Sequence, residues 1–281
     1  MLTLVLDAMR ETVRRKFVPA AAILTTAATL LSVWGFWSLA HLHTAAGRPI
    51  SFVEMRSTTA VLVIFGGFLF SFVLAFGAAV LAAPALSTDL ESGLLLPILA
   101  RAIPRQRIVV SKIAGLAIVL GIYAATASVL ELCAVYVTTG YIPPNPPAAI
   151  LALWGVSAVL LSLTMALSVR LPALASSLVA VMGFGLAWMI GIVAAFANVY
   201  HNATLARVGV ISQLLLPSDA MWRLAAYQLE PVAMLGRNGG FGPLGPFSVA
   251  SPPPPAMAWW TVAWCAGIIA LACWMFARRD A

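Results

Sequence analysis

Six stretches of the chain are each apolar over the length that a helix needs to cross a membrane. A hydrocarbon core about 30 Å thick takes about 20 helical residues, and a backbone surrounded by lipid must satisfy its own hydrogen bonds. We therefore predict an all-α integral membrane protein, a single transmembrane domain over residues 1–281. The predicted spans are Phe17–Leu39, Thr59–Ala83, Ile113–Thr139, Ala148–Val169, Ala173–Ala197 and Ala258–Phe276.

The composition agrees with this interpretation. Of the 281 residues, 62% are hydrophobic and only 9% are charged, whereas a soluble domain is about a quarter charged. The net charge of +7 does not indicate nucleic-acid binding, because the basic residues stand at the ends of the apolar stretches, where lipid headgroups would hold them.

The basic residues also predict the orientation. Most of them fall on one side of the predicted membrane, and basic residues favour the cytoplasm. We expect a multi-pass protein of the cell (inner or plasma) membrane with both termini in the cytoplasm. The predicted inner residues are Arg10, Arg14, Arg15, Lys16, Arg101, Arg105, Arg107, Lys112, Arg170, Arg278 and Arg279; the outer ones are Arg48, Arg56, Arg207, Arg223 and Arg237.

Two regions outside the spans have helical patterns. Apolar residues recur at helical spacing in Met1–Lys16, which predicts an amphipathic helix on the membrane surface. Before the last span, Ala203–Leu216 and Asp219–Leu229 predict two short outer helices separated by Pro217. Ser218 is the predicted N-cap of the second helix.

The longest polar interruption between the early spans is Leu86–Lys112, which we call the elbow. Ser87 or Thr88 could cap a short amphipathic helix over Asp89–Ile98. Pro104 stands where a new helix can begin, because a proline needs no N–H there. The orientation places the elbow in the cytoplasm.

The elbow resembles the cytoplasmic elbow of type-2 ABC exporter permeases. An acidic residue before Ser-Gly, a Leu-rich turn, a Pro-Arg pair and a lysine at the next span carry the resemblance. The chain is most similar to the permeases of nitrous oxide reductase maturation and of gliding motility. Leu216–Asp219 with Trp222-Arg223, and Phe276–Asp280, also resemble family segments. The residues in the elbow are Glu91, Gly93, Leu94–Leu96, Pro104, Arg105 and Lys112.

The sequence departs from the family pattern at two positions. Leu94 follows Gly93 where the family often has threonine, and Ala102 follows Arg101 where it often has proline. These departures affect the expected contacts of the elbow with a partner.

The resemblance implies a permease that is not itself an enzyme and that works with two copies of a separate ATP-binding subunit. It also implies a second permease copy, identical or homologous. The chain has no G-x-x-x-x-G-K-[ST] motif, so ATP and Mg are expected in the partner and no cofactor in this chain. The expected coupling residues are Asp89, Glu91, Gly93, Leu94, Arg101, Pro104, Arg105 and Lys112.

Glu131 is an acid deep inside a predicted span, and such acids are usually paired or functional. One interpretation is a substrate or proton contact in a transport path. The other is a structural pair with Arg207, Arg223 or Tyr136 beneath the outer helices.

Other chemistry has weaker support. We predict no metal site, because the external His41, His43 and His201 lack further ligands at metal-binding spacing, and no disulfide. Two alternatives to an exporter stay open: a subunit that anchors or transmits force without transport, and a membrane enzyme acting on lipid through Glu131 and His201.

Overall fold

The computed structural model describes residues 2–14, 17–40, 52–91, 104–200, 202–230, 249 and 253–278. Every regular element within these residues is a helix. The helices are α1 (Leu2–Arg14), α2 (Phe17–Ala40), α3 (Phe52–Glu91), α5 (Arg105–Thr139), α6 (Pro146–Ser168), α7 (Ala173–Val199), α8 (Ala203–Leu215), α9 (Ser218–Leu229) and α11 (Pro255–Ala277).

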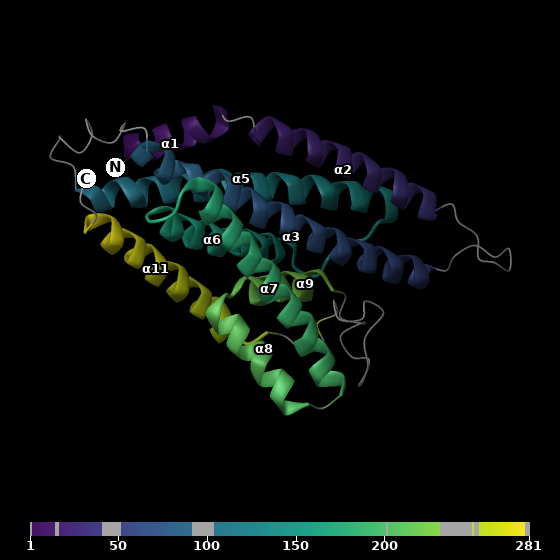
Figure 1. The fold of residues 1–281 in the computed structure, drawn as a ribbon. Coiled ribbons are helices and arrows are strands. Elements are labelled where there is room, and N and C mark those ends of the chain that lie inside the picture. Colours follow the sequence, from purple (N-terminus) through teal and green to yellow (C-terminus); the bar gives the residue numbers. More distant parts are fainter. Residues whose placement is uncertain are drawn as a thin grey trace.

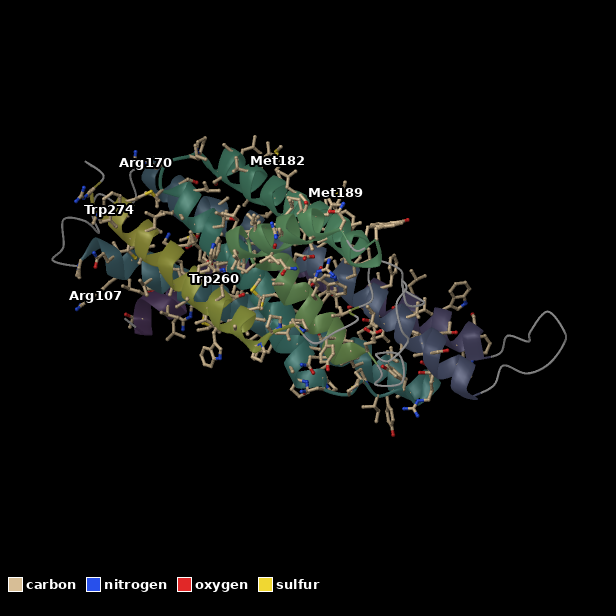
Figure 2. All side chains as sticks on the ribbon, turned by 90° about the horizontal axis from the view of Figure 1, so that it is seen from below. Arg107, Arg170, Met182, Met189, Trp260 and Trp274 are labelled. Carbon is tan, nitrogen blue, oxygen red and sulfur yellow. The ribbon has the colours of Figure 1, made fainter. Side chains whose placement is uncertain are left out.

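Six of the described helices are long and apolar enough to cross a membrane: α2, α3, α5, α6, α7 and α11. They confirm the predicted all-α membrane fold. Figure 1 shows an elongated bundle with both chain ends at the same end, which we call the terminus end; the other is the far end. Arg107 and Arg170 also lie at the terminus end (Figure 2).

The second and third spans belong to helices much longer than predicted. α3 has 40 residues and α5 has 35, so α3 is roughly 60 Å long at about 1.5 Å per residue. Pro84 lies inside α3 and does not end it. Both helices therefore exceed the thickness of a hydrocarbon core.

The continuity of α3 through Glu91 corrects the predicted cap of the elbow helix at Ser87 or Thr88. Residues 92–98 of the predicted helix over Asp89–Ile98 lie outside the described residues. The Ser87 hydroxyl donates to the Ala83 carbonyl one turn earlier, at 2.8 Å, inside the same helix. Hydroxyl groups in helices commonly make this bond. Asp89 thus lies in the last turn of α3 and not in the first turn of a new helix.

α6 forms the centre of the bundle. In its most apolar stretch 61% of the residues are buried, against 11% in α2 and 17% in α11. Leu160, Leu161 and Met165 are among its fully buried side chains. α6 packs against α3, α5, α7, α9 and α11, so α2 and α11 leave broad apolar faces for lipid or another chain.

A short link joins α5 to α6 at the far end. Gly140 ends α5 with φ 67°, in the left-handed region that glycine adopts without strain. Asn145 caps α6 by accepting from the Ala148 N–H, and Pro146 follows at the first helical position.

The two short helices before the last span are confirmed, and they break at Pro217 as expected. The N-cap of α9, however, is Pro217 and not Ser218, because the Met221 N–H donates to the Pro217 carbonyl. Ser218 is the first helical residue, and its buried Oγ has no hydrogen-bond partner among the described residues.

Candidate functional site

The predicted coupling residues surround the junction between α3 and α5 at the terminus end. Asp89 and Glu91 lie in the last turn of α3. Pro104 is the N-cap of α5, and Arg105 is its first residue. Three predicted residues, Gly93, Leu94 and Arg101, lie outside the described residues.

Lys112 ties the two helices of this junction together. Its Nζ donates to the Ala85 carbonyl of α3. The half-buried Lys112 is therefore part of the structure of the junction, whereas Arg107, one turn nearer to the start of α5, is exposed. Arg107 is thus the described basic side chain of the junction that a partner could reach most easily.

The amphipathic helix α1 packs on the same part of α5. A Cβ added at Gly115 would lie 2.8 Å from the Ala8 Cβ and 3.1 Å from the Val5 carbonyl oxygen. Ala8 and Thr12 form the buried side of α1. The junction is consequently braced by the N-terminal helix, which sequence reasoning placed only on the membrane surface.

Glu131, on α5, faces α2. Its carboxylate accepts hydrogen bonds from the hydroxyls of Thr29 and Ser32. It lines a cavity of about 280 Å³ between α2, α3 and α5. Among the described residues, neither Arg207 nor Arg223 lines the cavity, and Arg223 pairs with Asp219 instead. Pairing of Glu131 with Arg207 or Tyr136 stays a prediction.

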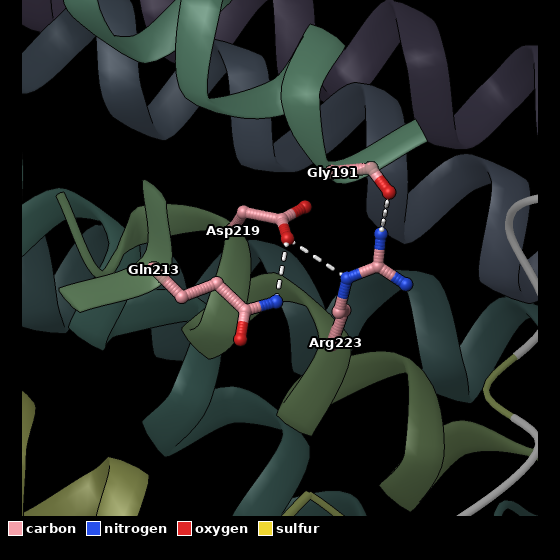
Figure 3. A network of polar contacts seen from close by, with 4 residues as sticks. All are labelled: Gly191, Gln213, Asp219 and Arg223. Atoms are coloured by element: carbon pink, nitrogen blue, oxygen red, sulfur yellow. Dashed lines mark hydrogen bonds and ion pairs between the residues drawn. The ribbon is translucent and has the colours of Figure 1, made fainter. Parts of the chain in front are cut away.

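Arg223 instead belongs to a polar network that joins α7, α8 and α9 (Figure 3). Its Nε donates to Asp219 Oδ2 at 2.8 Å, and its Nη2 donates to the Gly191 carbonyl at 2.6 Å. Gln213 of α8 donates to the same Asp219 oxygen at 3.1 Å. The Asp219–Arg223 pair of α9 thus links α8, through Asp219, to α7, through Arg223.

The network is nearly closed to solvent and lipid. The Asp219 side chain is 2% exposed and the Arg223 side chain 19%. Buried charges are stable in such a place only when paired and hydrogen-bonded. Asp219 also lies at the N-terminus of α9, where the helix dipole favours a negative charge.

α9 connects this network to the core of the bundle. The Trp222 ring lies 5.4 Å from the Phe68 ring of α3, centre to centre. Cβ atoms added at Gly67 of α3 and Gly155 of α6 would lie 3.3 Å from Leu229 and 3.0 Å from Met221. α9 is therefore wedged between two spanning helices.

A second group of buried polar side chains lies near the α5–α6 link at the far end. The Tyr141 hydroxyl donates to the Leu229 carbonyl at 2.8 Å, and the Val249 N–H donates to Glu230 at 3.3 Å. Burial raises the pKa of Tyr141 to about 12, which keeps its hydroxyl a donor. Burial also raises the pKa of Glu230 above its usual value of 4.5.

Sequence reasoning missed the partner of Arg223. It assigned Asp219 only to the N-terminus of its helix, although Asp219 and Arg223 are spaced by four, which is the spacing of a helical ion pair. Gly191 and Gln213 carried no such signal, because their helices are adjacent only in the folded chain. Arg207 is exposed on α8, and His41, His43 and His201 lie outside the described residues.

The comparison with protein families matches this chain over nearly its whole length. The model of the family described as ABC-2 family transporter protein covers residues 8–281. No curated protein matches the chain.

Proposed function

Since the chain belongs to the ABC-2 family of transporter proteins, we propose that it is the permease of an exporter driven by a separate ATP-binding subunit. Membership makes it a multi-pass membrane component of an ABC transporter that works with an ATP-binding subunit. The proposal includes three further points: transport is outward, two copies of the ATPase bind, and a second permease copy is present. The permease itself is non-catalytic; ATP and Mg belong to the partner.

The observation that carries the proposal is the junction of α3 and α5 at the terminus end. The excess of basic residues at this end supports a cytoplasmic position, which is where a soluble ATPase would bind a permease of the cell membrane. Arg107 and Arg170 lie there (Figure 2). The last turn of α3 contains acidic residues in the sequence, and Arg107 near the start of α5 is exposed. We expect a soluble partner to meet both signs of charge here.

The two long helices supply a route for force. α3 and α5 are each continuous from the junction toward the far end, and Lys112 couples them to each other. α3 also contacts α9 through Phe68 and Trp222. A tilt imposed on the junction would therefore reach the α8–α9 pair at the far end, where the exit of a transport path is expected.

Charge reversal at the junction tests this function. In Glu91→Lys we expect several-fold less ATP-binding subunit to co-purify with the chain, because Glu91 is the last residue of α3 and interface charges help to choose partners. Arg207→Glu is the matched control, since Arg207 is exposed on α8. The partner is first identified by co-purification with the unaltered chain.

Undiminished co-purification and undiminished ATP hydrolysis by the Glu91→Lys complex would contradict a coupling role for the junction. Reconstitution in liposomes distinguishes an exporter from a force-transmitting subunit. An exporter moves its substrate across the liposome membrane, whereas in a complex with a force-transmitting subunit ATP is hydrolysed and no solute crosses.

A further inference from the structure

The cavity beside Glu131 contains more polar groups than a lipid-facing pocket needs. Thr25, Thr29 and Ser32 recur at helical spacing along the face of α2 that lines it, and Ser128 and Glu131 line it from one face of α5. Thr25 is already bonded to the Tyr123 hydroxyl at 2.7 Å. The cavity is thus mostly apolar, with polar side chains on its α2 and α5 walls.

Ser128 has a hydroxyl for which the described part of the chain supplies no hydrogen-bond partner. Its side chain is 8% exposed, it lines the cavity, and its Oγ has no hydrogen-bond partner among the described residues. A buried hydroxyl without a partner is costly. A ligand in the cavity that donates a hydrogen bond to Ser128 would satisfy the acceptor side of this hydroxyl and so lower the cost.

Glu131 also faces no basic side chain among the described residues that line this cavity. Among the described residues that line it, none is Lys, Arg or His. The hydroxyls of Thr29 and Ser32 donate hydrogen bonds to the carboxylate but bring no positive charge. A carboxylate inside a membrane favours a cationic partner.

The remaining walls suit an apolar body. Val63, Phe70 and Leu153 are among the lining residues, and the rings of Phe70 and Tyr123 lie 5.9 Å apart. Aromatic rings attract cations as well as apolar groups. A volume of about 280 Å³ far exceeds the roughly 30 Å³ of one water and fits a small organic molecule.

We propose that the cavity between α2, α3 and α5 binds a small ligand that carries a protonated amine on an apolar body. The ammonium group has three donors and no acceptor. It donates to the Glu131 carboxylate and the Ser128 hydroxyl, and the apolar body fills the space between α2 and α3. This inference concerns binding, and it holds whether or not the ligand is the exported substrate.

The test uses the full chain in phosphatidylcholine nanodiscs, titrated by calorimetry with phenethylammonium and, for comparison, with the neutral 2-phenylethanol. Empty nanodiscs give the background of partition into lipid. We expect saturable binding of the amine and at least tenfold weaker binding of the alcohol, because a hydrogen bond to a charged group is stronger than a neutral one.

Two variants locate the site. Glu131→Gln keeps an acceptor for Thr29 and Ser32 but removes the charge, and should weaken amine binding about tenfold or more. Ser128→Ala should weaken it about two- to tenfold while leaving the melting temperature of the empty protein equal or higher, because the unpaired hydroxyl is gone. Ser177→Ala is the control, since that hydroxyl donates to Leu174 on α7, outside the cavity.

Ser128→Ala keeps the test decisive if Glu131→Gln does not fold. The proposal is overturned if the folded wild-type chain shows no saturable binding of the amine above empty nanodiscs, or if the alcohol binds as tightly. It is also overturned if the amine binds a folded Glu131→Gln or Ser128→Ala protein as tightly as the wild type.

Discussion

Gly191 has no room for a side chain, because Asp219 occupies the space where a Cβ would stand. A Cβ at Gly191 would lie 2.5 Å from Asp219 Oδ1 and 2.6 Å from its Cγ. The close approach lets the Gly191 carbonyl reach Arg223 while Arg223 also holds Asp219 (Figure 3). A single missing methyl group thus decides whether α7 and α9 can share the ion pair.

Gly191→Ala should therefore destabilise the protein by about 1–3 kcal/mol, the usual cost of overpacking, although alanine is the better helix former. The displaced Asp219 would lose its bonds to Arg223 and Gln213. The measurement is the melting temperature of the purified protein in detergent.

Gly185→Ala on the same helix is the matched control for this substitution. No atom lies within 4 Å of a Cβ added at Gly185, so helix propensity alone predicts no loss or a gain of up to about 1 kcal/mol. Equal changes in melting temperature for the two variants would show that Asp219 does not constrain α7.

At the scale of elements, α9 is held at both of its ends by groups from other parts of the chain. Near its start, Asp219 accepts a hydrogen bond from Gln213 of α8, and Arg223 donates one to the Gly191 carbonyl of α7. After its last turn, Glu230 accepts from the Val249 N–H, and Tyr141 donates to the Leu229 carbonyl. The α8–α9 pair is therefore bonded both to α7 and to the α5–α6 link.

Glu230, which accepts from the Val249 N–H, makes the stability of this region dependent on pH. Burial raises its pKa in the folded protein above the usual 4.5, so the folded chain holds a proton that the unfolded chain releases. This contribution to stability is complete below about pH 4.5 and is lost as pH rises through the folded-state pKa.

Glu230→Gln should remove this loss, because the amide stays neutral and its oxygen can still accept from Val249. The check is the melting temperature of both proteins between about pH 4 and pH 8. The wild type should lose more stability than the variant as pH rises. Parallel curves would rule out Glu230 as a titrating group of the fold.

At the scale of the whole molecule, the arrangement of helices predicts which surfaces face the cytoplasm. Both chain ends and Arg170 lie at the terminus end (Figures 1 and 2), and Arg207 is exposed on α8 of the α8–α9 pair. From the excess of basic residues we predict that the terminus end faces the cytoplasm.

Cysteine labelling tests this orientation. After Cys133, Cys265 and Cys273 are replaced by alanine, a single cysteine at position 207 should react with a membrane-impermeant maleimide in intact cells. One at position 170 should react only after lysis. Detergent-solubilised protein, in which both should react, is the control. Labelling of position 170 in intact cells would reverse or refute the topology.

The six spanning helices, α1 and the α8–α9 pair could be predicted from the sequence, because each depends on a local pattern of residues. Runs of apolar residues long enough for lipid determine the spans, helical spacing determines α1, and Pro217 separates α8 from α9. The family resemblance rested on short motifs, and the family match over residues 8–281 confirmed the family. The subgroup of nitrous oxide reductase maturation and gliding-motility permeases stays a prediction. The coupling residues of the elbow stay predictions.

The tertiary structure decided which side chains meet. Pro84 is tolerated inside α3, and Arg223 pairs with Asp219 while Glu131 faces the hydroxyls of α2. Hydropathy states only that a polar group in lipid needs a partner. The partner depends on how neighbouring helices are rotated and how closely they approach, which small residues such as Gly191 permit.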